Sequence, residues 1–410
     1  MKVLQVHGVD TAIHGSAIAM LRLQEGVRKA GIQSRVLCRQ PTHEDSVAIP
    51  RVRGEGRLQE LTSRLGLNEL HALGSLKIPN IAAYTEADLL HFHAIHGRFF
   101  NYLALPLLTK TKPAIYTLHD MWPLTAHCTY SFNCDRWQSG CGHCPYLKLP
   151  EMIQRDATWL EWRLKAWSYR RSNLTIVVPS TWIYGLAQQS MLSHLPIHHI
   201  PHGLDTDIYQ PLDRDMCRAA LGIPAGKKVL LFASRRLTPS ASLVKGVDLL
   251  VPVLTELPVS LRKETVLLLM GVGREALPQD FDMTVMSLGF LESDRLKAMA
   301  YSAADLFVSP TRAELFGIVL LESIACGTPV VSFRVGGVPE IVRPGLSGLL
   351  AEPEDSKQLS TAIVQLLEDD PLRTRLSEHC REIAVKEYNL DLYVDRHITL
   401  YQQVLDAAGA

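Results

Sequence analysis

The sequence predicts an α/β fold made of two doubly wound domains, each built on a parallel β-sheet. Three observations support this prediction. Short runs rich in Val, Ile and Leu alternate with longer amphipathic stretches along the whole chain. The chain has 410 residues, which is too long for one ordinary core and suggests two domains of about 200 residues each. Turn formers and charges interrupt the alternation at residues 202–228, where we place the domain boundary.

The strand-like runs fall on both sides of that boundary. In the first half they are residues 2–7, 34–39, 88–93, 114–119, 174–179 and 198–201. In the second half they are residues 228–233, 265–270, 284–289, 305–309, 329–333 and 348–351. Amphipathic helices are expected between them, for example over residues 16–30, 246–257, 294–304 and 355–367. The polar and basic residues 41–74 are expected to form a mobile insertion.

The expected N-terminal domain covers residues 1–203 and contains a cysteine-rich insertion at 127–145. The C-terminal domain covers residues 204–385, and residues 386–410 form a helix expected to pack back on the N-terminal domain. Open α/β sheets bind ligands beyond the carboxyl ends of their strands. We therefore expect an active site in a cleft between the two domains.

Composition excludes several classes of protein. Lys plus Arg and Asp plus Glu both number 42, so no global field attracts nucleic acid. The hydrophobic content of 47% and charged content of 20% are typical of a globular, soluble protein. The first residues, MKVLQVHGVD, lack the apolar core of a secretory signal, and no apolar run approaches the roughly 18 residues of a membrane span. We expect a cytoplasmic protein with reduced cysteines.

The segment TRAELFGIVLLESIACGTPVVSF, residues 311–333, suggests an anion site. A strand and loop lead into a helix expected over residues 316–326, which Gly327 ends. The first N–H groups of such a helix lack partners and attract anions. Glu322 lies roughly 8 to 9 Å along the axis, so a diphosphate at the helix start would place a ribose near it and a sugar near Glu314. The alternative is a solvated helix residue and an ordinary loop acid.

The segment VLLFASRRLTPSASLVKGVDLL, residues 229–250, supplies cations at the end of a strand. Arg235 or Arg236, together with Lys245, can neutralise a diphosphate whose charge grows as its bond to a sugar breaks. A solvated loop is the alternative.

Histidines and a glycine mark the strand ends of the first half. His119 follows an apolar strand where ligands bind, and Gly15 opens a helix close to backbone N–H groups. The alternatives are a structural histidine and a tight turn. His91, His93 and His96 are expected to line the cleft or pack in the core, because no acid follows them at the spacing of a metal site.

Half of the eight cysteines lie within CTYSFNCDRWQSGCGHC. Four thiolates in a reduced compartment suit a tetrahedral structural zinc, although two of the gaps depart from the paired C-x-x-C pattern. Unligated thiols or a redox role are the alternatives. The expected zinc ligands are Cys128, Cys134, Cys141 and Cys144.

The segment TWLEWRLKAWSYRR, residues 158–171, combines aromatic and basic side chains. Its aromatic residues do not form a single helical stripe, which favours a helix that packs within its domain. The alternative is a helix that contacts an anionic membrane. The side chains concerned are Trp159, Trp162, Trp167, Tyr169, Arg163, Lys165, Arg170 and Arg171, with Arg155 nearby.

Together these motifs resemble the retaining family-four glycosyltransferases, and the resemblance covers nearly the whole chain. ELFGIVLLE resembles the Glu-x7-Glu signature of that family, and FASR followed by KG resembles its arginine and lysine pair. HGLDTDIYQP is similar to the segment that opens its second domain, and VGGVPEIVRPGLSGLLAEPED to its glycine-rich C-terminal loop. HGSAIAMLRL, LLHFHAIHG and TLHDMWPLTAHCTYSFNCDRWQSGCGHCP resemble capsular and exopolysaccharide transferases of the colanic-acid type.

The resemblance implies a GT-B fold and a set of site residues. Glu314 would contact the donor hexose, and His119 would approach the transferred sugar. Leu315 and Ser234 stand where the family usually has glycine, and a second arginine leaves Arg235 and Arg236 as alternative phosphate ligands. The other implied donor contacts are Glu322 to the ribose, Arg235 and Lys245 to the diphosphate, the backbone amides of Phe316, Gly317 and Ile318, and Gly15 beneath the donor.

The implied activity is transfer of a hexose from a nucleoside-diphosphate sugar to a hydroxyl, with retained anomeric configuration and no required cofactor. The acceptor would be a sugar or a lipid-linked glycan in polysaccharide or glycoconjugate biosynthesis, and the enzyme would be cytoplasmic or peripheral at the inner face of the membrane. Two alternatives remain: a non-catalytic zinc-bearing binding protein of a polysaccharide cluster, and another GT-B enzyme such as an epimerase or a phosphorylase.

Overall fold

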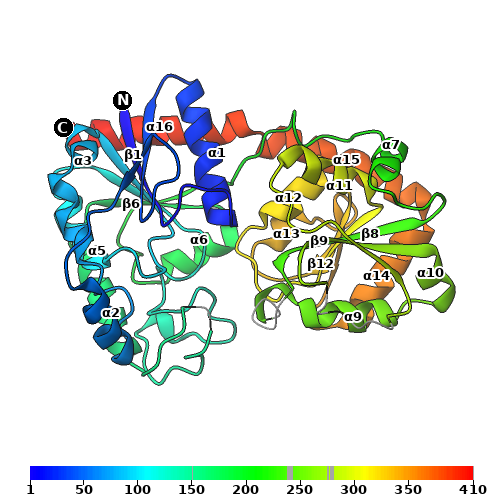
Figure 1. The fold of residues 1–410 in the computed structure, drawn as a ribbon, viewed down its shortest axis with the longest axis horizontal. Coiled ribbons are helices and arrows are strands. Elements are labelled where there is room, and N and C mark those ends of the chain that lie inside the picture. Colours follow the sequence, from blue (N-terminus) through cyan, green and yellow to red (C-terminus); the bar gives the residue numbers. More distant parts are fainter. Residues whose placement is uncertain (150, 238–242, 275–276, 278–280, 410) are drawn as a thin grey trace. The chain divides into compact units, whose positions relative to one another are not determined.

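The computed structural model describes residues 1–149, 151–237, 243–274, 277 and 281–409. The chain divides into two compact units, drawn in Figure 1. Unit 1 comprises Met1–Pro201 and Tyr393–Ala410, and unit 2 comprises His202–Leu392. The division at Pro201/His202 lies beside the boundary that the turn-rich segment suggested.

Unit 1 contains a seven-stranded sheet in the order β3-β2-β1-β4-β5-β6-β7, and all of its strand pairs are parallel. The strands are β1 (Lys2–Val6), β2 (Gln33–Cys38), β3 (Ser46–Ala48), β4 (Leu89–His93), β5 (Ala114–Thr117), β6 (Leu174–Val178) and β7 (Ile197–His199). The helices are α1 (Gly15–Lys29), α2 (Glu55–Arg64), α3 (Ala82–Glu86), α4 (Leu105–Leu108), α5 (Thr158–Arg170) and α6 (Thr181–Gln188), with short 3-10 turns η1 (Leu73–Asn80), η2 (Tyr102–Ala104) and η3 (Arg136–Gln138).

The C-terminal helix α16 (Leu390–Gly409) contributes most of its length to unit 1. It runs beside β1 and α1 in Figure 1. Gly26 of α1 permits this approach, because a Cβ there would lie 2.2 Å from a methyl carbon of Val394. Among the described residues, no helix combines the length and apolar character needed to cross a bilayer.

Unit 2 contains a six-stranded sheet in the order β10-β9-β8-β11-β12-β13, again parallel throughout. The strands are β8 (Lys228–Arg236), β9 (Thr265–Val272), β10 (Thr284–Ser287), β11 (Leu306–Ser309), β12 (Val330–Phe333) and β13 (Gly348–Ala351). The helices are α7 (Arg214–Ala220), α9 (Val247–Thr255), α10 (Val259–Glu264), α11 (Asp294–Ala303), α12 (Ile318–Ala325), α13 (Val338–Ile341), α14 (Ser356–Glu368) and α15 (Asp370–Tyr388).

Both sheets are doubly wound, as the sequence predicted. The strand order reverses between β1 and β4 in unit 1, and between β8 and β11 in unit 2. In such folds the crevice beyond the carboxyl ends of the strands at this switch point is where ligands bind. The loops that follow β4, β5, β8 and β11 therefore carry the candidate site residues.

Every expected strand is present, with ends shifted by a few residues. Among the described residues, the sequence missed β3, a three-residue edge strand within residues 41–74. The expectation of a mobile insertion there was wrong, because the segment also forms α2 and the start of η1.

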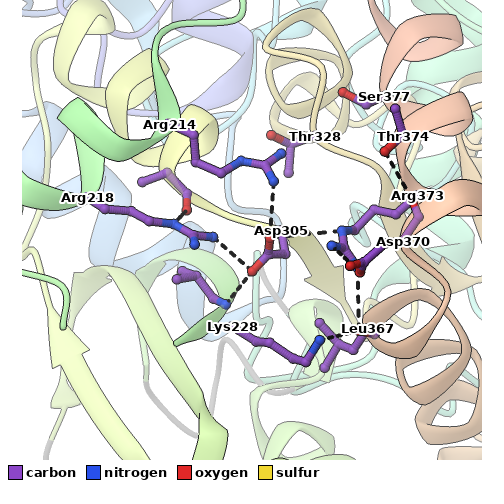
Figure 2. A network of polar contacts seen from close by, with 12 residues as sticks. Arg214, Arg218, Lys228, Asp305, Thr328, Leu367, Asp370, Arg373, Thr374 and Ser377 are labelled. Atoms are coloured by element: carbon purple, nitrogen blue, oxygen red, sulfur yellow. Dashed lines mark hydrogen bonds and ion pairs between the residues drawn. The ribbon is translucent and has the colours of Figure 1, made fainter. Parts of the chain in front are cut away.

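A buried carboxylate joins four segments of unit 2. Asp305, just before β11, accepts a hydrogen bond from the backbone N–H of Val229 in β8 at 2.7 Å. Its oxygens also pair with Arg214 and Arg218 of α7 at 3.3 and 2.9 Å, and with Arg373 of α15 at 3.9 Å. Figure 2 shows these guanidinium groups pointing at Asp305. Such convergence fixes the helices around the strand that leads into the candidate site.

We expect Asp305→Ala to lower the free energy of unfolding by about 3 kcal/mol, because it removes the carboxylate that pairs with three arginine side chains and leaves their charges without a partner there. Denaturant unfolding should show this as a lower midpoint. Asp370→Ala is the matched control, because Asp370 pairs with Arg373 at 2.6 Å but is largely exposed. It should leave the midpoint nearly unchanged, and equal midpoints for both variants would contradict a central role for Asp305.

Candidate functional site

The loop between β11 and α12, residues 310–317, is held by close backbone contacts and is here called the site loop. A Cβ at Gly246 would lie 1.7 Å from the carbonyl oxygen of Pro310, and one at Gly336 would lie 2.0 Å from that of Glu314. Both glycines also have positive φ, +64° and +52°. A side chain at either position would displace the site loop.

The site loop brings together two residues that the sequence singled out. The Nζ atom of Lys245 lies 2.6 Å from an Oε atom of Glu314. The lysine side chain is 40% exposed and the glutamate side chain 12% exposed. An ammonium group has three donors, so Lys245 can hold Glu314 and still meet an anionic ligand.

The arginine pair lies at the carboxyl end of β8. Both Arg235 and Arg236 are exposed, and a bulge interrupts the β8–β9 pairing between Ala233 and Arg236. Bulges redirect side chains at strand ends, often beside active sites. Within the described part of the chain neither guanidinium has a carboxylate partner, so both are available to an anion.

Helix α12 starts two residues later than expected, at Ile318, after Gly317 in the left-handed region at φ +96°. Its first turn contains no acid. Among the described residues, no protein acceptor faces the backbone N–H groups of Ile318 and Val319. Such donors, together with the helix dipole, can bind an anion. Phe316 is buried just before the helix.

Glu322 is buried in α12 and not solvated, so the alternative of an exposed helix residue is wrong. The hydroxyl of Tyr209 donates to one carboxylate oxygen at 3.1 Å, and that of Tyr301 to the other at 3.3 Å. The two tyrosines fix the orientation of the carboxylate. Sequence reasoning missed both, because they lie in segments far from Glu322 along the chain.

In unit 1, Gly15 is the first residue of α1. The hydroxyl of Ser16 lies 3.1 Å from Nε2 of His7 and 3.0 Å from Nδ1 of His14. Burial and the neighbouring His14 lower the pKa of His7 to about 3, so its ring is neutral at pH 7. The start of α1 therefore presents neutral polar groups beside β1.

His119 is half-buried after β5 and is hydrogen-bonded to a buried histidine. Nδ1 of His93 lies 3.0 Å from Nε2 of His119, and Nε2 of His93 lies 2.7 Å from Oε1 of Gln5. Burial, reinforced by neighbouring His91 and other histidines, lowers the pKa of His93 well below its usual range. A neutral His93 that donates to an amide oxygen must accept at Nδ1. With the Gln5 amide oriented to accept, this arrangement has His119 donate from Nε2.

The third histidine of that motif behaves differently. Nε2 of His96 lies 2.7 Å from Asp120, and its Nδ1 lies 3.3 Å from Glu151. Burial opposes the charged ring, but Asp120 and Glu151 together raise the pKa of His96 to about 10. The sequence favoured a packed or cleft-lining histidine over a metal ligand, and His96 is packed between these two acids. The partners come from distant segments, although Asp120 directly follows His119.

The four clustered cysteines line one cavity of about 10 Å³, together with His127 and Trp137. Burial raises the pKa of the Cys128 thiol to about 11 and that of Cys141 to about 12. In the part of the chain that the structure describes, no three His, Cys, Asp or Glu side chains are placed to hold a metal ion. The structure therefore does not support the expected zinc at Cys128, Cys134, Cys141 and Cys144.

The predicted site residues thus form two groups. Unit 2 brings Lys245 and Glu314 into contact, with the N-terminus of α12 directly after the site loop. Unit 1 holds Gly15 at the start of α1, the helix that follows β1, and His119 just after the end of β5.

The tautomer of His119 can be tested directly. In selectively labelled protein, the ¹⁵N spectrum of neutral His119 should show a protonated Nε2. In His93→Leu, which removes the acceptor, the spectrum should shift toward a mixture of tautomers. His119→Gln assigns the signal. A protonated Nδ1 in the wild-type protein would contradict the hydrogen-bond assignment.

The ion pairs of His96 predict a pH dependence of stability. Because its pKa rises from 6.5 to about 10 on folding, its stabilising contribution is fully present below pH 6.5 and is lost as the pH rises through 10. His96→Ala should therefore be about 3 kcal/mol less stable than wild type at pH 6.5, and the difference should shrink as the pH rises from 6.5 and be lost above pH 10. Denaturant unfolding across this range measures it, and a constant difference would refute the assignment.

Comparison with known proteins places the chain in a family. A family model described as "Glycosyl transferases group 1" matches residues 213–383, and one described as "Glycosyltransferase Family 4" matches residues 13–208. D-inositol 3-phosphate glycosyltransferase 1 of Catenulispora acidiphila is 33% identical over 55% of this chain and 54% of that protein. A GDP-mannose-dependent phosphatidylinositol monomannoside mannosyltransferase of Corynebacterium glutamicum is 32% identical over 51% of this chain and 57% of that protein. The matches span about half the length of these relatives.

Solved structures agree on the fold. Sucrose-phosphate synthase from Thermosynechococcus elongatus superposes with a TM-score of 0.72 at 20% identity, over 99% of this chain and all of that one. Anabaena HepE in complex with UDP and glucose superposes with a TM-score of 0.71 at 19% identity, over 98% of this chain and all of that one. Both units thus have the architecture of the GT-B fold that the sequence suggested. The chain belongs to the family-four, group 1 glycosyltransferases.

Proposed function

We propose that this protein is a retaining glycosyltransferase that transfers a hexose from a nucleoside-diphosphate sugar to a hydroxyl acceptor. The observation that carries the proposal is the contact between Lys245 and Glu314 in a loop that leads directly into the free N-terminus of α12. A cation, a carboxylate and unpaired amides at one strand end suit a diphosphate joined to a sugar.

In this proposal unit 2 binds the donor. Lys245 and either Arg235 or Arg236 neutralise the diphosphate, and the amides of Phe316, Gly317 and Ile318 donate to it. Glu322 binds the ribose hydroxyls with a carboxylate that its tyrosine partners hold in place. Glu314 contacts the hexose. Residues 204–385 form the donor domain, and residues 1–203 form the acceptor domain, with Gly15 beneath the donor and His119 beside the transferred sugar.

In this proposal the protein accelerates the reaction mainly by stabilising the charge on the departing diphosphate, and no covalent bond to the enzyme forms. The bond between the anomeric carbon and the phosphate oxygen breaks, and its electron pair leaves with the diphosphate. The acceptor oxygen bonds to the anomeric carbon on the same face, and its proton passes to the departing phosphate oxygen. In this proposal Lys245 and the positive end of α12 stabilise the negative charge that grows on the departing diphosphate, with little rearrangement of the protein.

The names of the related proteins suggest the class of donor substrate. Those names include a GDP-mannose-dependent enzyme, and the HepE structure holds UDP and glucose. We propose a UDP- or GDP-hexose as donor, and a sugar or lipid-linked glycan as acceptor. Exopolysaccharide biosynthesis is proposed on the resemblance of the N-terminal motifs alone.

A donor panel tests the function. The protein is incubated with UDP- and GDP-hexoses, with and without candidate acceptors, and release of free nucleoside diphosphate is measured. A transferase releases the diphosphate from at least one donor. An epimerase isomerises the donor without release, a phosphorylase shows the absorbance of a pyridoxal cofactor, and a non-catalytic binding protein does neither.

We expect Glu314→Ala and Lys245→Ala each to reduce donor turnover at least about tenfold, because each removes a group next to the developing charge. The matched control is the exposed pair Glu382 and Lys386 on α15, whose side chains lie 2.7 Å apart. Alanine at either control position should leave turnover unchanged. Near-normal rates in both site variants would exclude this site.

A further inference from the structure

Helix α5 carries an exposed row of side chains that the proposed reaction does not use. Trp159, Arg163 and Trp167 follow one another at intervals of four residues along one side of the helix, and Arg171, the residue just after it, stacks on Trp167. We call these four residues the α5 stripe. Trp159 is 54% exposed and Trp167 is 44% exposed, which is unusual for so large an apolar side chain.

The stripe is built from stacked pairs. The guanidinium of Arg163 lies 4.4 Å from the ring centre of Trp159, and that of Arg171 lies 4.6 Å from the ring centre of Trp167. A guanidinium group that stacks on an indole ring holds the ring in place through a cation–π interaction, and the exposed arginine loses little of its hydration. Further apolar surface adjoins it at Leu160, which is 38% exposed.

The opposite side of α5 explains why the stripe is free. Lys165 is fully buried there and donates hydrogen bonds to the carbonyl oxygens of Trp122 and Thr125 at 2.9 and 3.1 Å. Glu161 and Tyr169 are also buried on that side. The packing expected from the sequence is therefore present, but it uses other residues and leaves the stripe to a partner.

Charge selects the kind of partner. Arg155, Arg163, Arg170 and Arg171 are exposed on this segment. Within residues 152–171, all of which the structure describes, Asp156 is the one exposed acid, and it caps the helix through the N–H of Thr158 at 3.1 Å. The whole chain has no net charge, so this is a local cationic face.

We propose that the α5 stripe docks on the surface of a bilayer that contains anionic phospholipids. Indole rings prefer the boundary between water and acyl chains, and arginine side chains reach from there to phosphate groups. Cations close to the surface add electrostatic attraction that depends on the lipid charge. This inference extends the proposed function, because it places unit 1 at the surface where a lipid-linked acceptor would be found.

The test uses the full chain and vesicles of two compositions, phosphatidylcholine alone and a mixture with about one-third phosphatidylglycerol. Flotation should recover the protein with the anionic vesicles but not with the neutral ones. The tryptophan emission should shift to shorter wavelength on binding. Protein that stays in solution with the anionic vesicles, or that binds both compositions equally, would overturn the proposal.

Two double variants separate the contribution of the tryptophan rings from that of the arginine charges. Trp159→Ser with Trp167→Ser should weaken vesicle binding at least about tenfold. Arg163→Gln with Arg171→Gln should remove the preference for anionic vesicles. Because these side chains are exposed, thermal melting should be unchanged. Wild-type binding by the tryptophan variant would overturn the assignment to α5.

A matched control and a second readout complete the experiment. Met216→Ser with Leu296→Ser replaces two exposed apolar residues of unit 2, 72% and 45% exposed, and should bind as wild type does. Diphosphate release with a soluble acceptor should be the same in all of these variants. If the protein binds vesicles but releases no diphosphate, only the proposed function is contradicted. If it releases diphosphate but does not bind vesicles, only the membrane-docking proposal is contradicted.

Discussion

The approach of two glycine backbones to the site loop is the constraint on which the proposed donor site depends. Gly246 lies against Pro310 at the end of β11, and the residue before it in the chain is Lys245. Gly336 lies against the carbonyl of Glu314. Backbone contact therefore sets how closely the segments that carry Lys245 and Glu314 approach each other. A site prepared in this way needs little reorganisation when charge develops.

Unit 1 shows how environment leaves one of two nearby histidines neutral and the other positively charged. His93 faces Gln5 and other histidines, so burial keeps it neutral. His96, three residues later, faces Asp120 and Glu151 and is held protonated. The neutral ring can fix the tautomer of His119, whereas the charged ring joins the loops after β4 and β5.

The sequence predicted the sheets well because their central strands are buried on both faces and read as continuous apolar runs. It missed β3, whose three residues lie at an edge and include a polar serine. Residue spacing suggested zinc but does not report where thiols point. The acids beside His96 are 24 and 55 residues away from it, and only tertiary folding brings them together. Lys245 and Glu314 could be singled out from the sequence because each lies in a loop between a strand and a helix, where α/β sheets bind ligands, and the structure brings the two side chains into contact.

A crystal structure with a bound nucleoside diphosphate tests the central claim most directly, because it locates the anion without depending on the sugar or the acceptor. The account predicts that the diphosphate lies at the N-terminus of α12, within hydrogen-bond distance of Lys245 and of the amides of Gly317 and Ile318. A diphosphate bound elsewhere, with these groups unengaged, would contradict it.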